Sequence, residues 1–305
     1  MIKPSFKQKS KELIKKKHQK SLLSKIKIQG MAAELLGVTI KVFVICMVVT
    51  SANNNNLRIL DVAIAHFLII TALAHSIGRV SGCQLNPAVT LSLMVFRKLD
   101  LINGVLYMIM QLIGGIIGAL FAFVLSSKDW LDLESEISQM GNNTIAPNFT
   151  VFQGFFGEFL MTSILVFTVW AVCIHESPER CWAPVSIGAV VMTSVLILGP
   201  ITGNSLNPVR SFGPAVVTGK FFNDHWVFWV APLLGGLFGA SIYNLLYLKK
   251  REKTQTFNKP ITSDTQKNDT VLEMSNIEDV SSIKPTTYEE MKKPTTVKNV
   301  KFEID

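Results

Sequence analysis

The chain has 305 residues, of which 49% are hydrophobic and only 17% charged, whereas soluble proteins usually have about 25% charged residues. The net charge of +8 does not indicate nucleic acid, because ten lysines gather between Lys3 and Lys27 against Glu12 alone. Basic residues just before an apolar segment more often fix membrane orientation or contact anionic lipid. We therefore expect a lipid bilayer and no nucleic acid among the partners, and nothing in the sequence indicates a metal, a cofactor or an enzyme.

Six predominantly apolar stretches are long enough to cross a bilayer, which takes about 20 residues per helix. In chain order they are 32–52, 60–80, 101–126, 151–174, 183–201 and 225–247. An even number of spans puts both termini on one side. The basic start and the cluster Lys249-Lys250-Arg251 predict that this side is the cytoplasm. Residues 1–29 are then a basic cytoplasmic segment, and the polar residues 249–305 are expected to be a disordered cytoplasmic tail.

The connection 127–150 falls on the opposite side of the membrane in this topology. It contains the triplets Asn142-Asn143-Thr144 and Asn148-Phe149-Thr150, both of which have the form of a glycosylation acceptor. Asn142 and Asn148 are therefore candidate glycosylation sites.

Two further apolar segments, 86–97 and 207–219, are too short to span a bilayer. Each begins with Asn-Pro, and Asn favours the N-cap of a helix while Pro favours its first position. Asn86-Pro87-Ala88 and Asn207-Pro208-Val209 are therefore predicted to start two re-entrant half-helices. Interrupted segments in corresponding places of two halves indicate a transport site near the membrane midplane.

The two halves of the chain match at a nearly constant offset. Asn86 and Asn207 are 121 residues apart, as are Gly114-Gly115 and Gly235-Gly236, and Glu34 precedes Glu158 by 124. Each repeat, about 30–126 and 151–248, holds three spans and one half-helix. Because three is odd, the second repeat must be inverted, and the N-termini of the half-helices meet in the middle.

These motifs, SGCQLNPAVT at 81–90 and GNSLNPVRSFG at 203–213, resemble those of the aquaporin and glycerol-facilitator (major intrinsic protein) family. The resemblance covers residues 30–248. It implies an all-α hourglass of six transmembrane helices and two half-helices, which acts as a passive channel for water or small neutral solutes. It also implies a homotetramer in which every subunit has its own pore. Val209 departs from the family's usual Ala.

The resemblance assigns further roles by position. Asn86 and Asn207 offer amide hydrogens to passing water, and Arg210 is the selectivity-filter arginine. Counting from the motifs places His66, Val195 and Asn204 in the same filter, where strict water channels usually have Phe and His at the first two positions. Losing that pair usually widens a filter, although Asn204 could narrow it again. Glu34 and Glu158 are expected to hold backbone groups of the half-helix loops.

Which solutes pass is left open by these residues. Ser211, Ala215 and Phe228-Trp229 follow the water-type pattern, whereas the filter is similar to those of vacuolar and ammonia-permeable relatives. Glycerol, urea, ammonia and hydrogen peroxide therefore stand beside water as candidate solutes. Either the plasma membrane or an internal vacuole membrane would suit the chain.

Gating is a hypothesis from charged residues near the expected cytoplasmic mouth. The candidate residues are His75, Arg79, His175, Glu176 and Ser177. Lys41 lies inside the first span, where an apolar residue is usual, and the sequence offers no firm account of it. The alternative reading is a non-conducting aquaporin-like scaffold or junction protein, although the external segments are short for contact loops.

Overall fold

The computed structural model describes residues 26–55, 57–127, 139–175 and 181–248, all within one unit, Met1–Lys253. Most of the expected N-terminal segment and all of the expected tail, 249–305, lie outside the described residues. The helices are α2 (Ile28–Asn55), α3 (Ile59–Ser81), α4 (Pro87–Val95), α5 (Leu101–Leu125), α6 (Val151–Val169), α7 (Ala183–Thr202), α8 (Pro208–Thr218) and α9 (Val227–Tyr243). Three short helical segments accompany them, η1 (Gln139–Gly141), η2 (Trp170–Ile174) and η4 (Asn244–Leu248).

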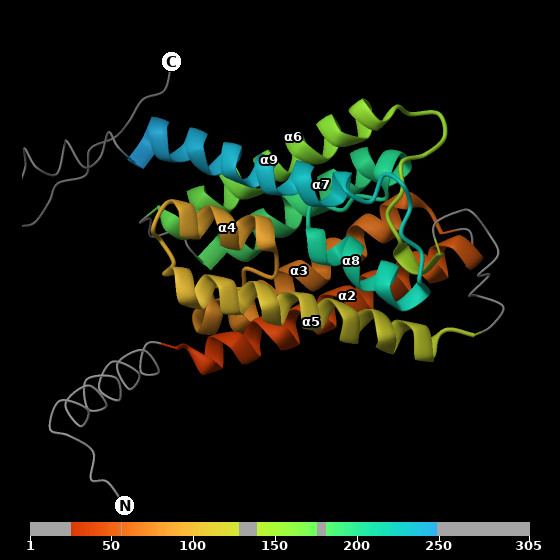
Figure 1. Ribbon diagram of the computed structural model, residues 1–305, viewed down its shortest axis with the longest axis horizontal. Helices are drawn as coiled ribbons and strands as arrows, with labels where there is room; N and C mark the ends of the chain where they lie inside the picture. Colours follow the sequence, from red (N-terminus) through yellow and green to blue (C-terminus); the bar gives the residue numbers. More distant parts are fainter. Residues whose placement is uncertain (1–25, 56, 128–138, 176–180, 249–305) are drawn as a thin grey trace, which may run out of the picture. The chain divides into compact units, whose positions relative to one another are not determined.

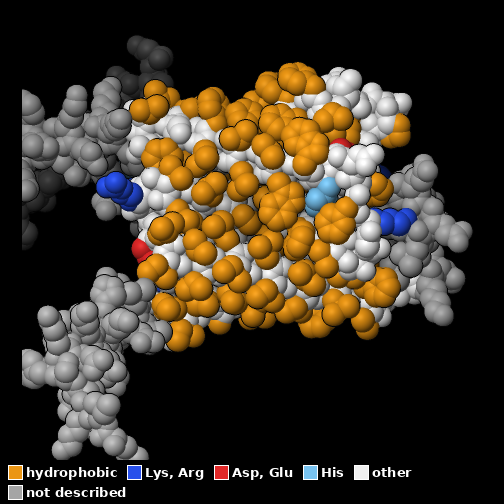
Figure 2. Space-filling view, in the orientation of Figure 1, with side chains coloured by type: hydrophobic (Ala, Val, Ile, Leu, Met, Phe, Trp, Pro, Cys, Tyr) orange, Lys and Arg blue, Asp and Glu red, His pale blue; other side chains and the backbone are white. Residues whose placement is uncertain are grey.

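Six of these helices are long and apolar enough to cross a membrane. They cover Ile28–Ala52, Ile59–Ser81, Leu101–Leu125, Val151–Ile174, Ala183–Thr202 and Val227–Tyr247. Large apolar side chains such as Leu68, Phe121 and Phe156 are exposed on them, and Figure 2 shows a face that is hydrophobic across its middle, with the visible lysines and arginines at its two ends. A surface of this kind suits a bilayer rather than water. The prediction of six spans and two short helices is confirmed.

Helix starts in the described part of the chain follow the local capping rules. Thr150 accepts a hydrogen bond from the backbone N–H of Gln153, whose side chain in turn accepts from the Thr150 N–H, so the two form a capping box at the start of α6. Asp100 caps α5 through the Asn103 N–H at 3.0 Å. Such caps satisfy backbone donors that the first helical turn leaves without partners.

The long helices pack in pairs that repeat between the two halves. In Figure 1, α2 runs along α5, and α6 runs along α9. Glycine makes both approaches possible, since a Cβ atom at Gly118 would overlap the Thr39 carbonyl and one at Gly239 would overlap the Ser163 carbonyl. Gly118 and Gly239 are 121 residues apart, so the same device serves both halves.

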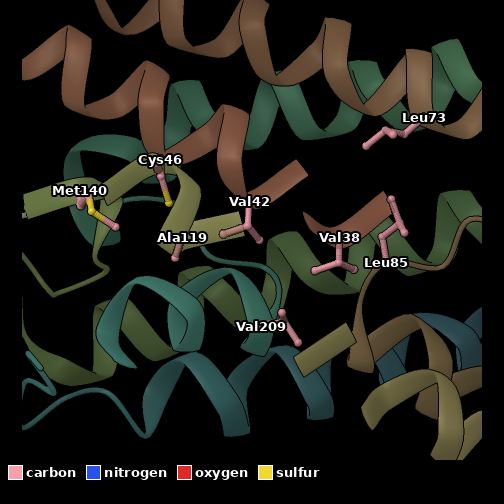
Figure 3. Packing of buried hydrophobic residues seen from close by; sticks show 9 residues of the cluster. Val38, Val42, Cys46, Leu73, Leu85, Ala119, Met140 and Val209 are labelled. Atoms are coloured by element: carbon pink, nitrogen blue, oxygen red, sulfur yellow. The ribbon is translucent and has the colours of Figure 1, made fainter. Parts of the chain in front are cut away.

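The half-helices lie inside the bundle, where α4 contacts α6 and α9 and α8 contacts α2 and α5. Figure 3 shows how α8 is held: Val209 lies among Val38, Val42 and Ala119, in one buried apolar cluster with residues of α2 and α5. Both half-helices are thus fixed by packing against membrane-length helices, which positions their N-termini at the site described next.

Candidate functional site

The two Asn-Pro motifs start the two half-helices. The side-chain oxygen of Asn86 accepts from the Ala88 N–H at 2.9 Å, and that of Asn207 accepts from the Val209 N–H at 3.0 Å. Pro87 and Pro208 occupy the first helical positions, where the missing N–H costs nothing. Each asparagine therefore uses its oxygen to cap its own helix and keeps its amide hydrogens for other partners.

Those amide groups reach across to the opposite loop. Asn86 Nδ2 donates to the Leu206 carbonyl at 2.8 Å, and Asn207 Nδ2 donates to the Leu85 carbonyl at 2.7 Å. The two hydrogen bonds join residues that are 120 or more positions apart in the chain. The N-termini of α4 and α8 therefore meet, with one hydrogen of each amide engaged and the other left for a passing group.

The loops before the motifs have a strained backbone. Cys83, Leu85, Asn204 and Leu206 all have positive φ angles between 49° and 56°, a region that residues other than glycine rarely adopt. Alternation of these angles turns successive N–H groups toward a single acceptor on a neighbouring helix. The strain persists because the surrounding contacts determine the conformation.

The acceptors are two fully buried glutamates. Glu34 accepts from the N–H groups of Gln84 and Leu85 at 2.9 and 2.7 Å. Glu158 accepts from those of Ser205 and Leu206 at the same two distances. Each carboxylate thus receives two backbone hydrogen bonds from a loop that has no helical partner for them.

A further donor differs between the halves. Gln111 Nε2 donates to Glu34 at 2.8 Å and to Thr90 Oγ1 at 3.0 Å. In the second half the Thr202 hydroxyl donates to Glu158 at 2.6 Å. The repeat therefore conserves the geometry of the carboxylate but not the identity of its side-chain partner.

Arg210 follows the second motif and is only 3% exposed. Its guanidinium donates to the Gly141 carbonyl and, at 3.4 Å, to the Gly203 carbonyl, while Nε has no hydrogen-bond partner among the described residues. Gly141 belongs to the segment before α6, so residues far from the motif determine where the arginine lies. No motif or spacing in the sequence indicates this contact.

The same segment is tied to the bundle through Asn143. Its side chain donates to the Thr202 carbonyl at 2.8 Å and accepts from the Ser211 hydroxyl at 2.7 Å. Asn142 is 2% exposed and its amide nitrogen donates to Thr218 at 2.8 Å. Burial and this protein partner weigh against a glycan on Asn142, whereas Asn148 is exposed, and both sites stay predictions.

A cavity of about 980 Å³ reaches the meeting point of the half-helices. His66, Asn204 and Arg210 line it together with Asn86 and Asn207. His66 donates from Nδ1 to the Val62 carbonyl at 2.8 Å, which directs Nε2 to the other side of the ring. Three of the four expected filter residues thus share one cavity.

Two predicted positions lie elsewhere. Val195 is buried on α7 but is not part of the cavity lining, where Val191 of the same helix lies instead. Val209 packs against Gly115 in the bundle core and likewise does not line the cavity. The unusual valine is therefore accommodated by the packing of α8 on α5.

The candidate gate residues divide in the structure. His75 and Arg79 line the cavity, whereas His175 is hydrogen-bonded through Nδ1 to the Tyr243 hydroxyl at 2.8 Å. Glu176 and Ser177 lie outside the described residues. Lys41, for which the sequence offered no account, lines the cavity and donates from Nζ to the Leu85 carbonyl at 2.8 Å.

Comparison with known proteins agrees with this geometry. Residues 21–243 match the family model described as major intrinsic protein. The chain is 32% identical over 240 residues to nodulin-26 of Glycine max, covering 77% of this chain and 84% of that protein. It is 34% identical over 221 residues to aquaporin-8 of Mus musculus, covering 72% and 82%.

A solved structure shows the same fold. The X-ray structure of the aquaglyceroporin from Plasmodium falciparum superimposes with a TM-score of 0.66 at 21% identity, covering 73% of this chain and 98% of that one. The family match spans more than two thirds of the chain and includes both half-helices. The chain belongs to the major intrinsic protein family, and it is an integral membrane channel for water or small neutral solutes rather than an enzyme.

Proposed function

We propose that the chain forms a passive pore in which water passes the two half-helix N-termini through the cavity. The observation that carries this proposal is the reciprocal pair of hydrogen bonds from Asn86 and Asn207 to the opposite loops, made where both side chains line the cavity. Each amide keeps one hydrogen for the oxygen of a passing water. A water bound to both donors would turn its hydrogens away from the midpoint.

Charge selection follows from the same arrangement. Each half-helix directs the positive end of its dipole at the meeting point, and Arg210 adds a full charge close by. Opposed helix ends and an arginine oppose cations and protons, as in aquaporin-type channels generally. Neutral molecules with oxygen or nitrogen lone pairs can accept from the donors of Asn86, Asn207 and Arg210 there.

His66, Asn204 and Arg210 are proposed as the selectivity filter. All three are at most 4% exposed yet line the cavity, which supports a constriction built from polar side chains. The aromatic ring expected in a strict water channel is replaced by His66, so we propose that one or more of ammonia, urea, glycerol and hydrogen peroxide passes beside water. Glu34 and Glu158 are proposed to hold the loops that carry the motifs.

Assembly, topology and regulation complete the proposal. We expect a homotetramer with one pore per subunit and with both termini in the cytoplasm, in the plasma membrane or an internal vacuole membrane. His75 and Arg79 are proposed as gate residues, since both line the cavity. The matched relatives named nodulin-26 and aquaporin-8 support a channel without deciding the solute.

The test is a solute panel on proteoliposomes that contain the purified protein. Vesicles are exposed in turn to gradients of an impermeant sugar, glycerol, urea and ammonia, and their volume or internal pH is followed by stopped flow. Arg210→Ala should raise the flux of glycerol or urea relative to water, because a side chain that fills the filter is removed. If vesicles with wild-type protein pass neither water nor any of these solutes faster than bare lipid, the result would indicate the non-conducting scaffold instead.

A further inference from the structure

Lys41 breaks the symmetry of the inverted repeat on the wall of the cavity. The offset of 124 residues that relates Glu34 to Glu158 relates Lys41 to Leu165, and both side chains line the cavity. One half of the pore wall therefore presents an ammonium group where the other half presents an apolar side chain. Its position on α2 is fixed by packing, since Lys41 is only 6% exposed.

The ammonium group lies beside the two motifs. Nζ donates to the Leu85 carbonyl at 2.8 Å, and the same carbonyl accepts from Asn207 Nδ2 at 2.7 Å. An ammonium group has three donors, so two N–H bonds remain after the bond to Leu85. These two N–H bonds lie on the cavity wall. The amide groups of Asn86 and Asn207, which line the same cavity, each also have one hydrogen without a partner.

The charge of Lys41 has no direct counter-charge in the described part of the chain. The ion pair found there joins Arg58 to Asp61, on the surface, so Lys41 has no carboxylate within 4.0 Å. Glu34, whose oxygens accept from Gln84, Leu85 and Gln111, acts on Lys41 only from beyond that distance. An unpaired charge at this depth is costly unless the lumen supplies a partner.

The cavity as a whole is cationic. Lys41, Arg79 and Arg210 line it, and no aspartate or glutamate does so among the residues that the structure describes. Arg210 Nε also lacks a hydrogen-bond partner there. A cleft lined by one sign of charge concentrates the opposite ion, and rings of Lys and Arg are the elements from which anion pores are built.

We propose that the cavity holds a binding site for a small monovalent inorganic anion, of the size of chloride or nitrate, with Lys41 Nζ as its principal donor. This site rests on the proposed function in that the same cavity carries the water. The anion neutralises the buried ammonium, accepts its remaining hydrogens and occupies the path beside Asn86 and Asn207. Gluconate, a much bulkier polyhydroxy anion, is not expected to fit between Lys41 Nζ and the two asparagines.

Binding is measured directly by the line width of the ³⁵Cl resonance with purified protein in detergent, titrated with unlabelled nitrate. Wild-type protein should broaden the line and nitrate should reverse the effect. Lys41→Leu, which copies the symmetry-related Leu165, should weaken binding at least about tenfold, since a hydrogen bond to a charged group is worth that factor or more. Lys98→Leu is the matched control, because Lys98 is exposed and does not line the cavity.

Lys41→Arg keeps the charge and should keep the binding, which separates loss of the site from loss of the fold. Equal broadening by Lys41→Leu and wild type, or no nitrate-sensitive broadening by wild type, would overturn the proposal. A measurement without variants gives a second check: water flux through wild-type proteoliposomes should be lower in chloride than in gluconate at equal osmolality. Equal flux in the two media would contradict an anion in the water path.

The two proposals fail separately in these experiments. If wild-type protein conducts water but binds no chloride, the anion site is refuted and the channel proposal stands. If the protein binds chloride through Lys41 but conducts no water, the anion site stands and the proposed function is refuted.

Discussion

Replacing Glu158 by glutamine tests the account of the half-helix loops. The carboxylate accepts from the N–H groups of Ser205 and Leu206 and from the hydroxyl of Thr202, at 2.9, 2.7 and 2.6 Å. Glutamine has one acceptor oxygen, so one of these donors would face an amide NH₂, and the remaining bonds would lose the charge. Hydrogen bonds to charged groups are worth about 1.5–3 kcal/mol each. We therefore expect Glu158→Gln to lower the free energy of unfolding by about 3 kcal/mol.

The assay is unfolding in mixed micelles, followed by circular dichroism as the mole fraction of sodium dodecyl sulfate rises. Thr202→Val removes a single donor and should give a smaller shift in the same direction. Thr193→Val is its control, because the Thr193 hydroxyl is exposed and bonds only to the Ala189 carbonyl of its own helix. If Glu158→Gln unfolds at the same midpoint as wild type, the loop does not depend on the carboxylate and the reasoning is refuted.

Three other outcomes follow from the structure. Gly118→Ala should lower the melting temperature, because the new Cβ would overlap the Thr39 carbonyl, while Gly78→Ala, which has open space around it, should not; equal melting of both would contradict the packing account. Burial lowers the pKa of His225 below its ordinary value of 6.5, so protonation favours the unfolded chain, and stability should fall as pH drops below about 6.5, with a flatter melting profile in His225→Gln. If Arg79 gates the cavity, Arg79→Ala should raise water flux per protein, and unchanged flux would remove it from the gate.

The elements of the fold could be predicted because membrane helices are encoded by length and composition. The expected span 101–126 corresponds to α5 at Leu101–Leu125, and the expected half-helix 86–97 corresponds to α4 at Pro87–Val95. Asn-Pro starts were informative since capping is a local property. The C-terminal end of α6, where Trp170–Ile174 forms a π-helix, was not predicted, because no local signal marks that change of hydrogen-bond register.

The site was harder to predict, because its contacts join distant parts of the chain. Asn86, Asn207 and the glutamates could be found through the repeat, which relates residues in pairs. The hydrogen bond from Arg210 to the Gly141 carbonyl involves the connection between the two repeats, which has no counterpart within either repeat. Counting positions placed Val195 in the filter, and this stays a prediction: Val195 is buried on α7, one helical turn from Val191 of the cavity lining, and counting does not give the rotation of the helix.

The contact that Lys41 makes could not be predicted from the sequence either. Its sequence position put it inside a span, where a lysine could extend to the membrane surface or face a neighbouring subunit. Only the packing of α2 against the first motif decides that Nζ meets the Leu85 carbonyl. A residue that sequence reasoning left without a role thus becomes the basis of the proposed anion site.

The most direct test of the central claim is the osmotic water permeability of proteoliposomes measured by stopped flow. Wild-type protein should shrink vesicles faster than bare lipid, with a low activation energy. Leu165→Trp should abolish the increase because Leu165 lines the cavity, whereas Ile164→Trp, on the exposed neighbouring position, should leave it unchanged. Wild-type flux equal to bare lipid, or equal flux in the two tryptophan variants, would contradict water transport through this cavity.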